Sequence, residues 1–240
     1  MTSLDSTTQA KLARVRERIE RAADAAGRRG DGITLLAVSK TFGADRVREA
    51  IDAGQARFGE NYVQEARTKM AEIAALGLPQ PVEWHFIGPI QSNKTREIAQ
   101  GFDWVQSLDR LKDAQRLDRQ RPQAMPRLNV LLQVNVSAET SKRGVAPQDV
   151  AALAAQVAAL PRLCLRGLMA IPEPHPDPAH RRAQFARMRQ LLQALREDLA
   201  GLPAAQIDTL SVGMSDDLED AIAEGSTMVR IGTAIFGARQ

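Results

Sequence analysis

The sequence predicts a single α/β domain, a closed (β/α)8 barrel of the TIM type with one extra helix at its N-terminus. Short apolar runs alternate with amphipathic stretches along the chain, which is typical of parallel strands joined by helices. Eight such runs can be counted, and eight strand–helix units close into a barrel. The 240 residues are close to the ~250 typical of this fold, so we expect residues 1–240 to form one domain.

The extra helix is expected at about residues 6–27, where apolar residues such as Leu12, Val15 and Ile19 recur every three or four positions. The run ITLLAVSK at 33–40 is the first strand, because continuous apolar sequence suits a strand buried on both faces. The later strands are expected within ARFGEN, VEWHFIG, FDWVQSL, RLNVLLQVNV, LCLRGLMAI, TLSVGMS and MVRIG. Helices are expected near 44–53, 61–75, 92–100, 109–120, 147–159, 179–199 and 216–224.

Composition excludes several classes of protein and one alternative fold. An open doubly wound sheet would carry a G-x-G-x-x-G phosphate fingerprint after its first strand, and this chain has none. No apolar run approaches the ~20 residues that cross a bilayer, and the N-terminus has no apolar segment typical of a secretory signal. The single cysteine, Cys164, fits a reducing cytoplasm. Basic residues are scattered among acids without interleaved aromatics, so we expect neither nucleic acid nor a membrane as a partner.

Lys40 is the first candidate for chemistry, since functional residues of such barrels lie where the strands end. Only six of the 32 basic residues are lysines, and Lys40 directly follows the first apolar strand. Partial desolvation there would lower the pKa of its amine and favour attack on an aldehyde. The alternative is a lysine that leaves the barrel mouth and binds anions as a point charge.

The last two strands predict a phosphate site at the same mouth. Gly232 and Thr233 follow the eighth strand, and Ser215 is expected to open a helix after Gly213. Backbone N–H groups at such turns bind phosphate, and barrels often place it after strands seven and eight. The alternative is that these glycines only serve tight turns.

Three further residues are candidates for the same pocket. Arg230 would point inward one step before the phosphate loop, unless it forms a salt bridge with Glu60 or Asp216. Asn61 could line the pocket. His85 could also do so, although a lone histidine on an apolar strand is often a satisfied core residue. His175 and His180 have no partners at metal-ligand spacing, so no metal site is expected.

The basic loop at 137–147 follows the fifth strand. It could attract a second phosphate-bearing ligand or help to load a cofactor. A plain solvated loop is the alternative.

These residues lie in motifs that resemble the pyridoxal phosphate homeostasis proteins. The motifs are LLAVSK, FGENYVQE, WHFIGPIQSNK, GLMAI, LSVGMSDD and VRIGTAIFG, in that order over about residues 33 to 237. The resemblance implies a barrel like the N-terminal domain of alanine racemases. It also implies pyridoxal 5′-phosphate as cofactor, bound to Lys40 as a Schiff base.

The other cofactor contacts follow from the same resemblance. Arg230 would approach the pyridine nitrogen, and a cation there makes the ring a weaker electron sink. The phosphate would be held by Ser215, Gly232 and Thr233, with Met214 and Asn61 beside the ring.

Two functions remain open at this stage. The first is a carrier or buffer of pyridoxal phosphate that maintains amino-acid and keto-acid balance and passes the cofactor to apo-enzymes, without robust catalysis. The second is a racemase of low activity, which needs an acid/base on each face of the substrate. Tyr62 is the only tyrosine that could supply the second base, and we expect it to pack a helix instead. A sugar-phosphate barrel would leave Lys40 without a task. A cytoplasmic monomer is the expected state.

Overall fold

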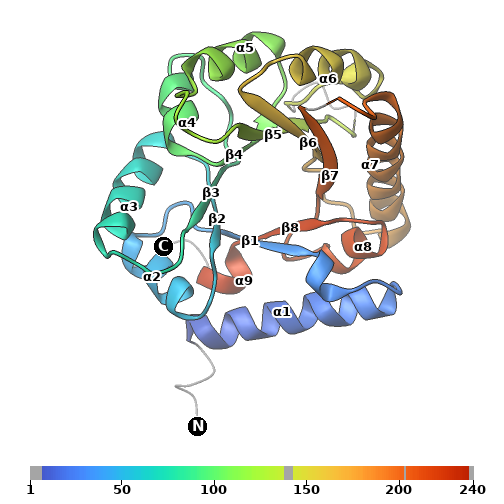
Figure 1. Cartoon of the computed structure of the whole chain (residues 1–240). Coiled ribbons are helices and arrows are strands. Elements are labelled where there is room, and N and C mark those ends of the chain that lie inside the picture. Colours follow the sequence, from blue (N-terminus) through green and yellow to red (C-terminus); the bar gives the residue numbers. More distant parts are fainter. Residues whose placement is uncertain (1–6, 138–142, 203, 238–240) are drawn as a thin grey trace.

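Eight parallel strands close into a barrel in chain order, β1 to β8, in the computed structural model of this chain (Figure 1). The structure describes residues 7–137, 143–202 and 204–237. The strands are β1 (Thr34–Val38), β2 (Arg57–Glu60), β3 (Glu83–Phe86), β4 (Trp104–Leu108), β5 (Leu128–Gln133), β6 (Leu163–Met169), β7 (Ala205–Ser211) and β8 (Met228–Ile231). The predicted (β/α)8 barrel is therefore confirmed, and the alternative of an open sheet is wrong.

Helices surround the barrel, with α1 lying across the outside of the β1 and β8 side (Figure 1). They are α1 (Thr8–Ala25), α2 (Ala44–Asp52), α3 (Val63–Ala75), α4 (Thr95–Gly101), α5 (Leu111–Gln120), α6 (Val150–Ala158), α7 (Pro178–Asp198), α8 (Leu218–Ala223) and α9 (Thr233–Phe236). Short 3-10 helices span Gly30–Gly32 and Pro147–Asp149. The prediction missed α9, because four residues are too few to show helical periodicity. No helix among these residues is long and apolar enough to span a membrane.

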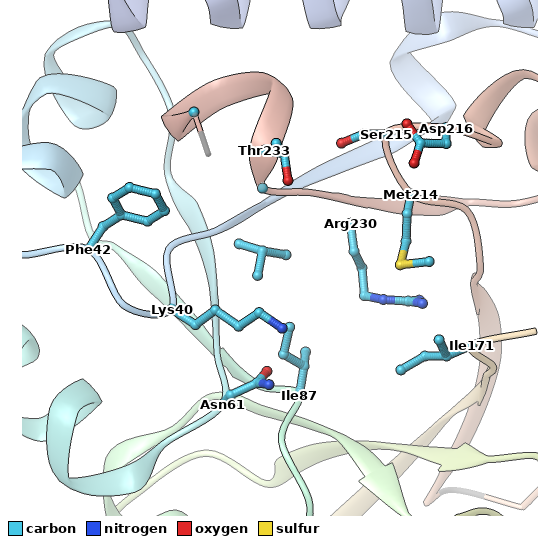
Figure 2. A pocket seen from close by; sticks show the side chains of 13 residues that line it. Lys40, Phe42, Asn61, Ile87, Ile171, Met214, Ser215, Asp216, Arg230 and Thr233 are labelled. Atoms are coloured by element: carbon cyan, nitrogen blue, oxygen red, sulfur yellow. The ribbon is translucent and has the colours of Figure 1, made fainter. Parts of the chain in front are cut away.

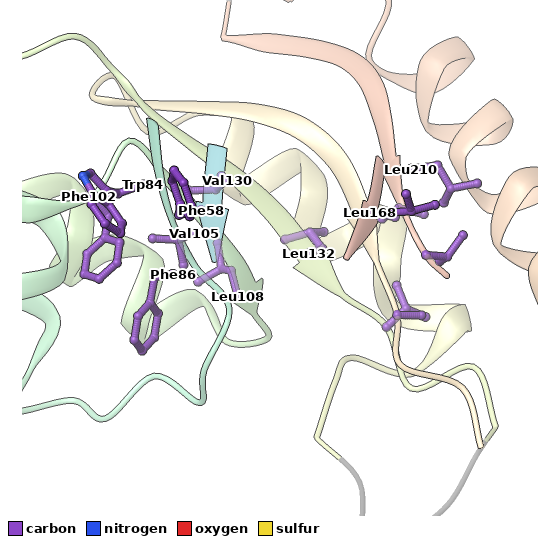
Figure 3. Packing of buried hydrophobic residues seen from close by; sticks show 14 of the residues in the cluster. Phe58, Trp84, Phe86, Phe102, Val105, Leu108, Val130, Leu132, Leu168 and Leu210 are labelled. Carbon is purple, nitrogen blue, oxygen red and sulfur yellow. The ribbon is translucent and has the colours of Figure 1, made fainter. Parts of the chain in front are cut away.

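The main core lies between the strands and the surrounding helices (Figure 3). Side chains alternate along each strand, so Trp84 and Phe86 join this core. Phe86 meets Phe102 edge to face, with ring centroids 5.3 Å apart. A separate small cluster of Trp104, Leu131 and Met169 lies apart from the main core. Cys164 is buried, as expected for a small apolar side chain.

Helix α1 is tied to the C-terminal part of the chain by arginines. Arg18 donates to the Ser215 carbonyl oxygen at 3.0 Å and forms an ion pair with Glu219. Arg28 donates to the carbonyl oxygens of Ile222 and Ser226. The extra helix thus supports the loop between β7 and α8, which contributes to the site described below.

Candidate functional site

A cavity of about 250 Å³ opens where the strands end (Figure 2). Its volume is just below the ~300–1,000 Å³ usual for small-molecule sites. It is lined by Val38, Lys40, Phe42, Asn61, Ile87, Ile171, Met214, Ser215, Asp216, Arg230, Gly232, Thr233 and Gly237. Seven of the eight predicted site residues therefore share one cavity. The eighth, His85, is not among the residues that line it.

The backbone on both sides of Lys40 is held by polar side chains of α3. Lys69 of α3 donates to the Ser39 carbonyl oxygen at 2.8 Å. The Thr41 N–H donates to the Glu65 carboxylate at 2.6 Å, and Thr41 has a left-handed φ of 70°. Such a φ is costly for a β-branched residue, so these contacts stabilise a strained turn. The turn directs the Lys40 side chain into the cavity (Figure 2).

A buried ion pair forms the centre of this support. The Lys69 Nζ lies 2.5 Å from Glu60 Oε1 and 3.2 Å from Glu65 Oε1. Lys69 is 3% exposed and Glu60 is fully buried. Burial raises the pKa of Glu60, and Lys69 and the Ser39 hydroxyl oppose that rise. We call Ser39, Glu60, Glu65 and Lys69 the Lys69 cluster. Sequence reasoning missed it, although Glu65 and Lys69 have the i,i+4 spacing of a helical ion pair.

Arg230 faces the cavity from the side opposite Lys40 (Figure 2). Its guanidinium donates to the carbonyl oxygens of Ser211 and Ala170, at 2.6 and 2.9 Å, and to the Ser211 hydroxyl at 2.8 Å. Burial lowers the pKa of Arg230 to about 10, so it remains a cation at neutral pH. The alternative prediction was a salt bridge to Glu60 or Asp216, but among the described residues Arg230 forms no ion pair with either, and Glu60 is paired with Lys69.

Ser215, Gly232 and Thr233 all line the cavity, and Figure 2 shows the side chains of Ser215 and Thr233 on the side where α9 begins. Thr233 begins α9, whose first N–H groups have no partner within the helix. A Cβ at Gly232 would lie 3.2 Å from the Val38 carbonyl oxygen, so only glycine fits easily. Ser215 does not open α8, which begins three residues later at Leu218.

The loop before Ser215 is shaped by Gly213. Its φ of +95° favours glycine, and a Cβ there would lie only 2.6 Å from the Ala221 Cβ. The Met214 N–H donates to Asp217 Oδ1 at 2.6 Å. This contact and the hydrogen bond from Arg18 hold the loop on both sides of Ser215.

His85 lies inside the barrel rather than at the cavity wall. It is fully buried, stacks on Trp104 and contacts Glu83 and Gln106. Alternate residues of a strand share a side, so Ile87, which lines the cavity, lies between His85 and the cavity. The reading of His85 as a satisfied core residue agrees with this placement.

Two other predictions concern the basic loop and Tyr62. Residues 138–142 of the basic loop are outside the described residues, so its role stays a prediction. Tyr62 does not pack under a helix, since it is 56% exposed. It lines a second cavity of about 320 Å³, which shares Asn61 with the first.

Comparisons with known proteins agree on one family. Residues 10–240 match the family model described as the N-terminal domain of alanine racemase. The chain is 60% identical over 234 residues to the pyridoxal phosphate homeostasis protein of Pseudomonas aeruginosa, covering 98% of this chain and 96% of that protein. It is 54% identical over 230 residues to the protein of the same name from Escherichia coli K12, covering 95% of each.

Solved structures resemble the chain at two levels. PipY of Synechococcus elongatus with pyridoxal phosphate (PLP) bound has a TM-score of 0.81 and 35% identity, covering 96% of this chain and 100% of PipY. Alanine racemase of Corynebacterium glutamicum has a TM-score of 0.62 and 19% identity, covering 93% of this chain and 60% of the racemase. The second likeness concerns the fold alone.

Proposed function

Since the chain belongs to the family of pyridoxal phosphate homeostasis proteins, we propose that its cavity binds pyridoxal 5′-phosphate at Lys40 and that the protein carries or buffers this cofactor. One observation supports this most strongly. One small cavity is lined by a primary amine, by a buried arginine, and by the hydroxyl residues and the glycine that follow β7 and β8. PipY, whose whole length this chain matches, has PLP bound in its solved structure.

The lining residues match the three parts of the cofactor. Lys40 offers the amine for the aldehyde, and Ser215, Gly232 and Thr233 offer donors for the phosphate. Bound pyridoxal phosphate supplies an aldehyde that condenses with a primary amine with loss of water, and a ring that withdraws electrons. Arg230 stays cationic and would disfavour protonation of the ring nitrogen. Met214 and Asn61 would lie beside the ring.

The residues around the cavity favour carriage over racemisation. Racemisation requires an acid/base on each side of the reacting carbon. Among the described residues, no tyrosine or histidine lines the first cavity, and Tyr62 lines the second. Arg230 also weakens the ring as an electron sink. We therefore propose transfer of the cofactor to apo-enzymes by a cytoplasmic monomer, without rapid turnover of amino acids.

The binding proposal is tested by spectroscopy and covalent trapping. Purified protein mixed with pyridoxal phosphate should gain a near-visible absorbance band, and borohydride should then fix the cofactor on the peptide that contains Lys40. The variant Lys40→Ala should lose both results. Lys94→Ala, at the second cavity, should keep both. Absence of the band in wild-type protein, or trapping on another lysine, contradicts the proposal.

The carrier proposal has a separate test. Loaded protein should restore activity to an apo-enzyme that depends on pyridoxal phosphate, and Lys40→Ala should not. Racemisation of alanine or serine at ~1 s⁻¹ or faster, within the usual range of enzymes, would instead establish the racemase alternative.

A further inference from the structure

A continuous line of hydrogen bonds runs through the barrel interior from Arg230 to Glu83. Arg230 Nη1 lies 2.8 Å from the Ser211 hydroxyl, which lies 2.7 Å from Gln106 Oε1. Gln106 Nε2 lies 2.9 Å from His85 Nδ1, and His85 Nε2 lies 2.8 Å from Glu83 Oε1. We call these five residues the interior chain. It links four strands, β3, β4, β7 and β8, by side-chain contacts alone.

The chemistry of its two ends sets the direction of the interior chain. Arginine can only donate, so the Ser211 oxygen accepts from Arg230 and its own hydrogen is directed to Gln106 Oε1. The Gln106 amide therefore presents its N–H groups to His85 and to the Met228 sulfur, 3.1 Å away. His85 Nδ1 must then accept, which places the ring proton on Nε2, facing the Glu83 carboxylate.

Burial makes this arrangement demanding. His85, Gln106 and Ser211 are fully buried, and Arg230 is 4% exposed. A buried polar atom that loses its partner is destabilising, so a flip of Gln106 or a change of His85 tautomer is unfavourable. The other guanidinium contacts of Arg230 are to backbone carbonyls of the sheet. In the described part of the chain, Ser211 supplies its only hydrogen-bonding side chain.

We propose that Ser211, Gln106 and His85 are positioning residues that hold the Arg230 guanidinium at the cavity, with His85 as a neutral anchor protonated on Nε2. The proposal rests on the proposed function where it concerns the cofactor, because Arg230 acts there through its contact with the ring. In this proposal His85 affects the cofactor through Gln106, Ser211 and Arg230, without contacting the cofactor itself.

The charges around His85 are consistent with a neutral ring. Burial lowers the pKa of His85, while Glu83 and Asp103 oppose the shift and Arg57 adds to it. His85 stacks on Trp104, with ring centroids 5.1 Å apart. A second proton would sit on Nδ1 and face the Gln106 N–H groups, so both burial and the interior chain disfavour it.

The first test needs no cofactor. Nitrogen-15 NMR of histidine-labelled protein should show His85 neutral at pH 7, with the proton on Nε2; the sequence has only three histidines, which simplifies assignment. Ser211→Ala removes the hydroxyl that orients Gln106 and should shift the nitrogen-15 resonance of Nδ1, whose donor is then no longer fixed, while Glu83 keeps the proton on Nε2. Gln106→Glu places a carboxylate beside Nδ1 and should make His85 cationic. A wild-type Nδ1–H tautomer, or an unchanged ring in both variants, overturns the proposal.

The second test measures the cofactor. Ser211→Ala should weaken pyridoxal phosphate binding by about 3- to 10-fold, the scale of one buried hydrogen bond, and shift the pH midpoint of the near-visible band. Leu117→Ala is the control, because Leu117 is also fully buried but lies in helix α5, in the core cluster outside the barrel. It should lower stability without moving that midpoint.

The outcomes separate the two proposals. If wild-type protein shows no band, the proposed function fails. The NMR test still decides whether the interior chain fixes the protonation state of His85. If wild-type protein loads normally while Ser211→Ala matches it in affinity and midpoint, the positioning role is wrong. An equal shift of the midpoint in Leu117→Ala also contradicts that role, since the effect would then follow general loss of packing.

Discussion

Replacement of Lys69 by methionine tests how much the Lys69 cluster stabilises the backbone next to Lys40. Methionine keeps an unbranched apolar side chain, one atom shorter than that of lysine, and removes the charge. The change breaks contacts from Nζ to the Ser39 carbonyl, to Glu60 and to Glu65. Glu60 would stay fully buried with the Ser39 hydroxyl as its remaining partner, because its second oxygen has no hydrogen bond in the described residues.

The magnitude follows from the unpaired charge. Breaking a buried ion pair costs about 3–5 kcal/mol. The second pair, between Lys69 and the partly exposed Glu65, adds little to this loss of stability. Burial already raises the pKa of Glu60, and loss of Lys69 should raise it further. A carboxyl group with a raised folded-state pKa stabilises the fold below its unfolded pKa and loses this contribution as pH rises. The loss in Lys69→Met should therefore shrink by up to about 1.4 kcal/mol per pH unit as pH falls towards 4.5.

Urea unfolding at several pH values measures these effects. The double variant Lys69→Met with Glu60→Gln removes both charges, and we expect it to recover to within about 1–2 kcal/mol of wild type. Glu65→Gln is the control for the exposed partner and should cost less than about 1 kcal/mol. A loss below about 1 kcal/mol in Lys69→Met, or additive losses in the double variant, would refute the reasoning.

Three further predictions concern pH, a glycine and the extra helix. Burial lowers the pKa of His85, so stability should fall as pH drops below about 6.5, by up to about 1.4 kcal/mol per unit; urea unfolding of His85→Gln should lack this component. Gly213→Ala should cost about 2–3 kcal/mol in urea, more than Gly77→Ala, because only the first added methyl meets a neighbour at 2.6 Å. Arg18→Ala frees the Ser215 carbonyl and should weaken pyridoxal phosphate binding by about 3- to 10-fold in an absorbance titration.

Each of these predictions has an outcome that contradicts it. Parallel pH curves for wild-type and His85→Gln protein would mean that the histidine takes up protons equally in both states. Equal losses for the two glycine variants would remove the steric argument at Gly213. Unchanged binding in Arg18→Ala, with Arg48→Ala as the control for an exposed ion pair, would show that α1 does not support the phosphate end.

The barrel was predictable because its evidence is local. Each apolar run predicts one strand, and each amphipathic stretch between two runs predicts one helix. Eight alternating strand–helix units are compatible with few folds. Strand ends in a parallel barrel share one mouth, so Lys40, Asn61 and Arg230 could be grouped without coordinates. Element ends shifted by a few residues, and α9 was missed because one helical turn has no period.

The barrel, its mouth and the residues that meet there follow from the order of residues alone. Which polar residues are buried, and which partners they meet, emerges from the folded barrel, because burial and pairing depend on elements that are far apart in sequence. The i,i+4 spacing of Glu65 and Lys69 is typical of a surface ion pair on a helix. The fold instead buries Lys69 against the carbonyl oxygen of Ser39, the residue before Lys40. His85 reads as a residue near the mouth, yet Ile87 separates it from the cavity and Gln106 connects it to Arg230.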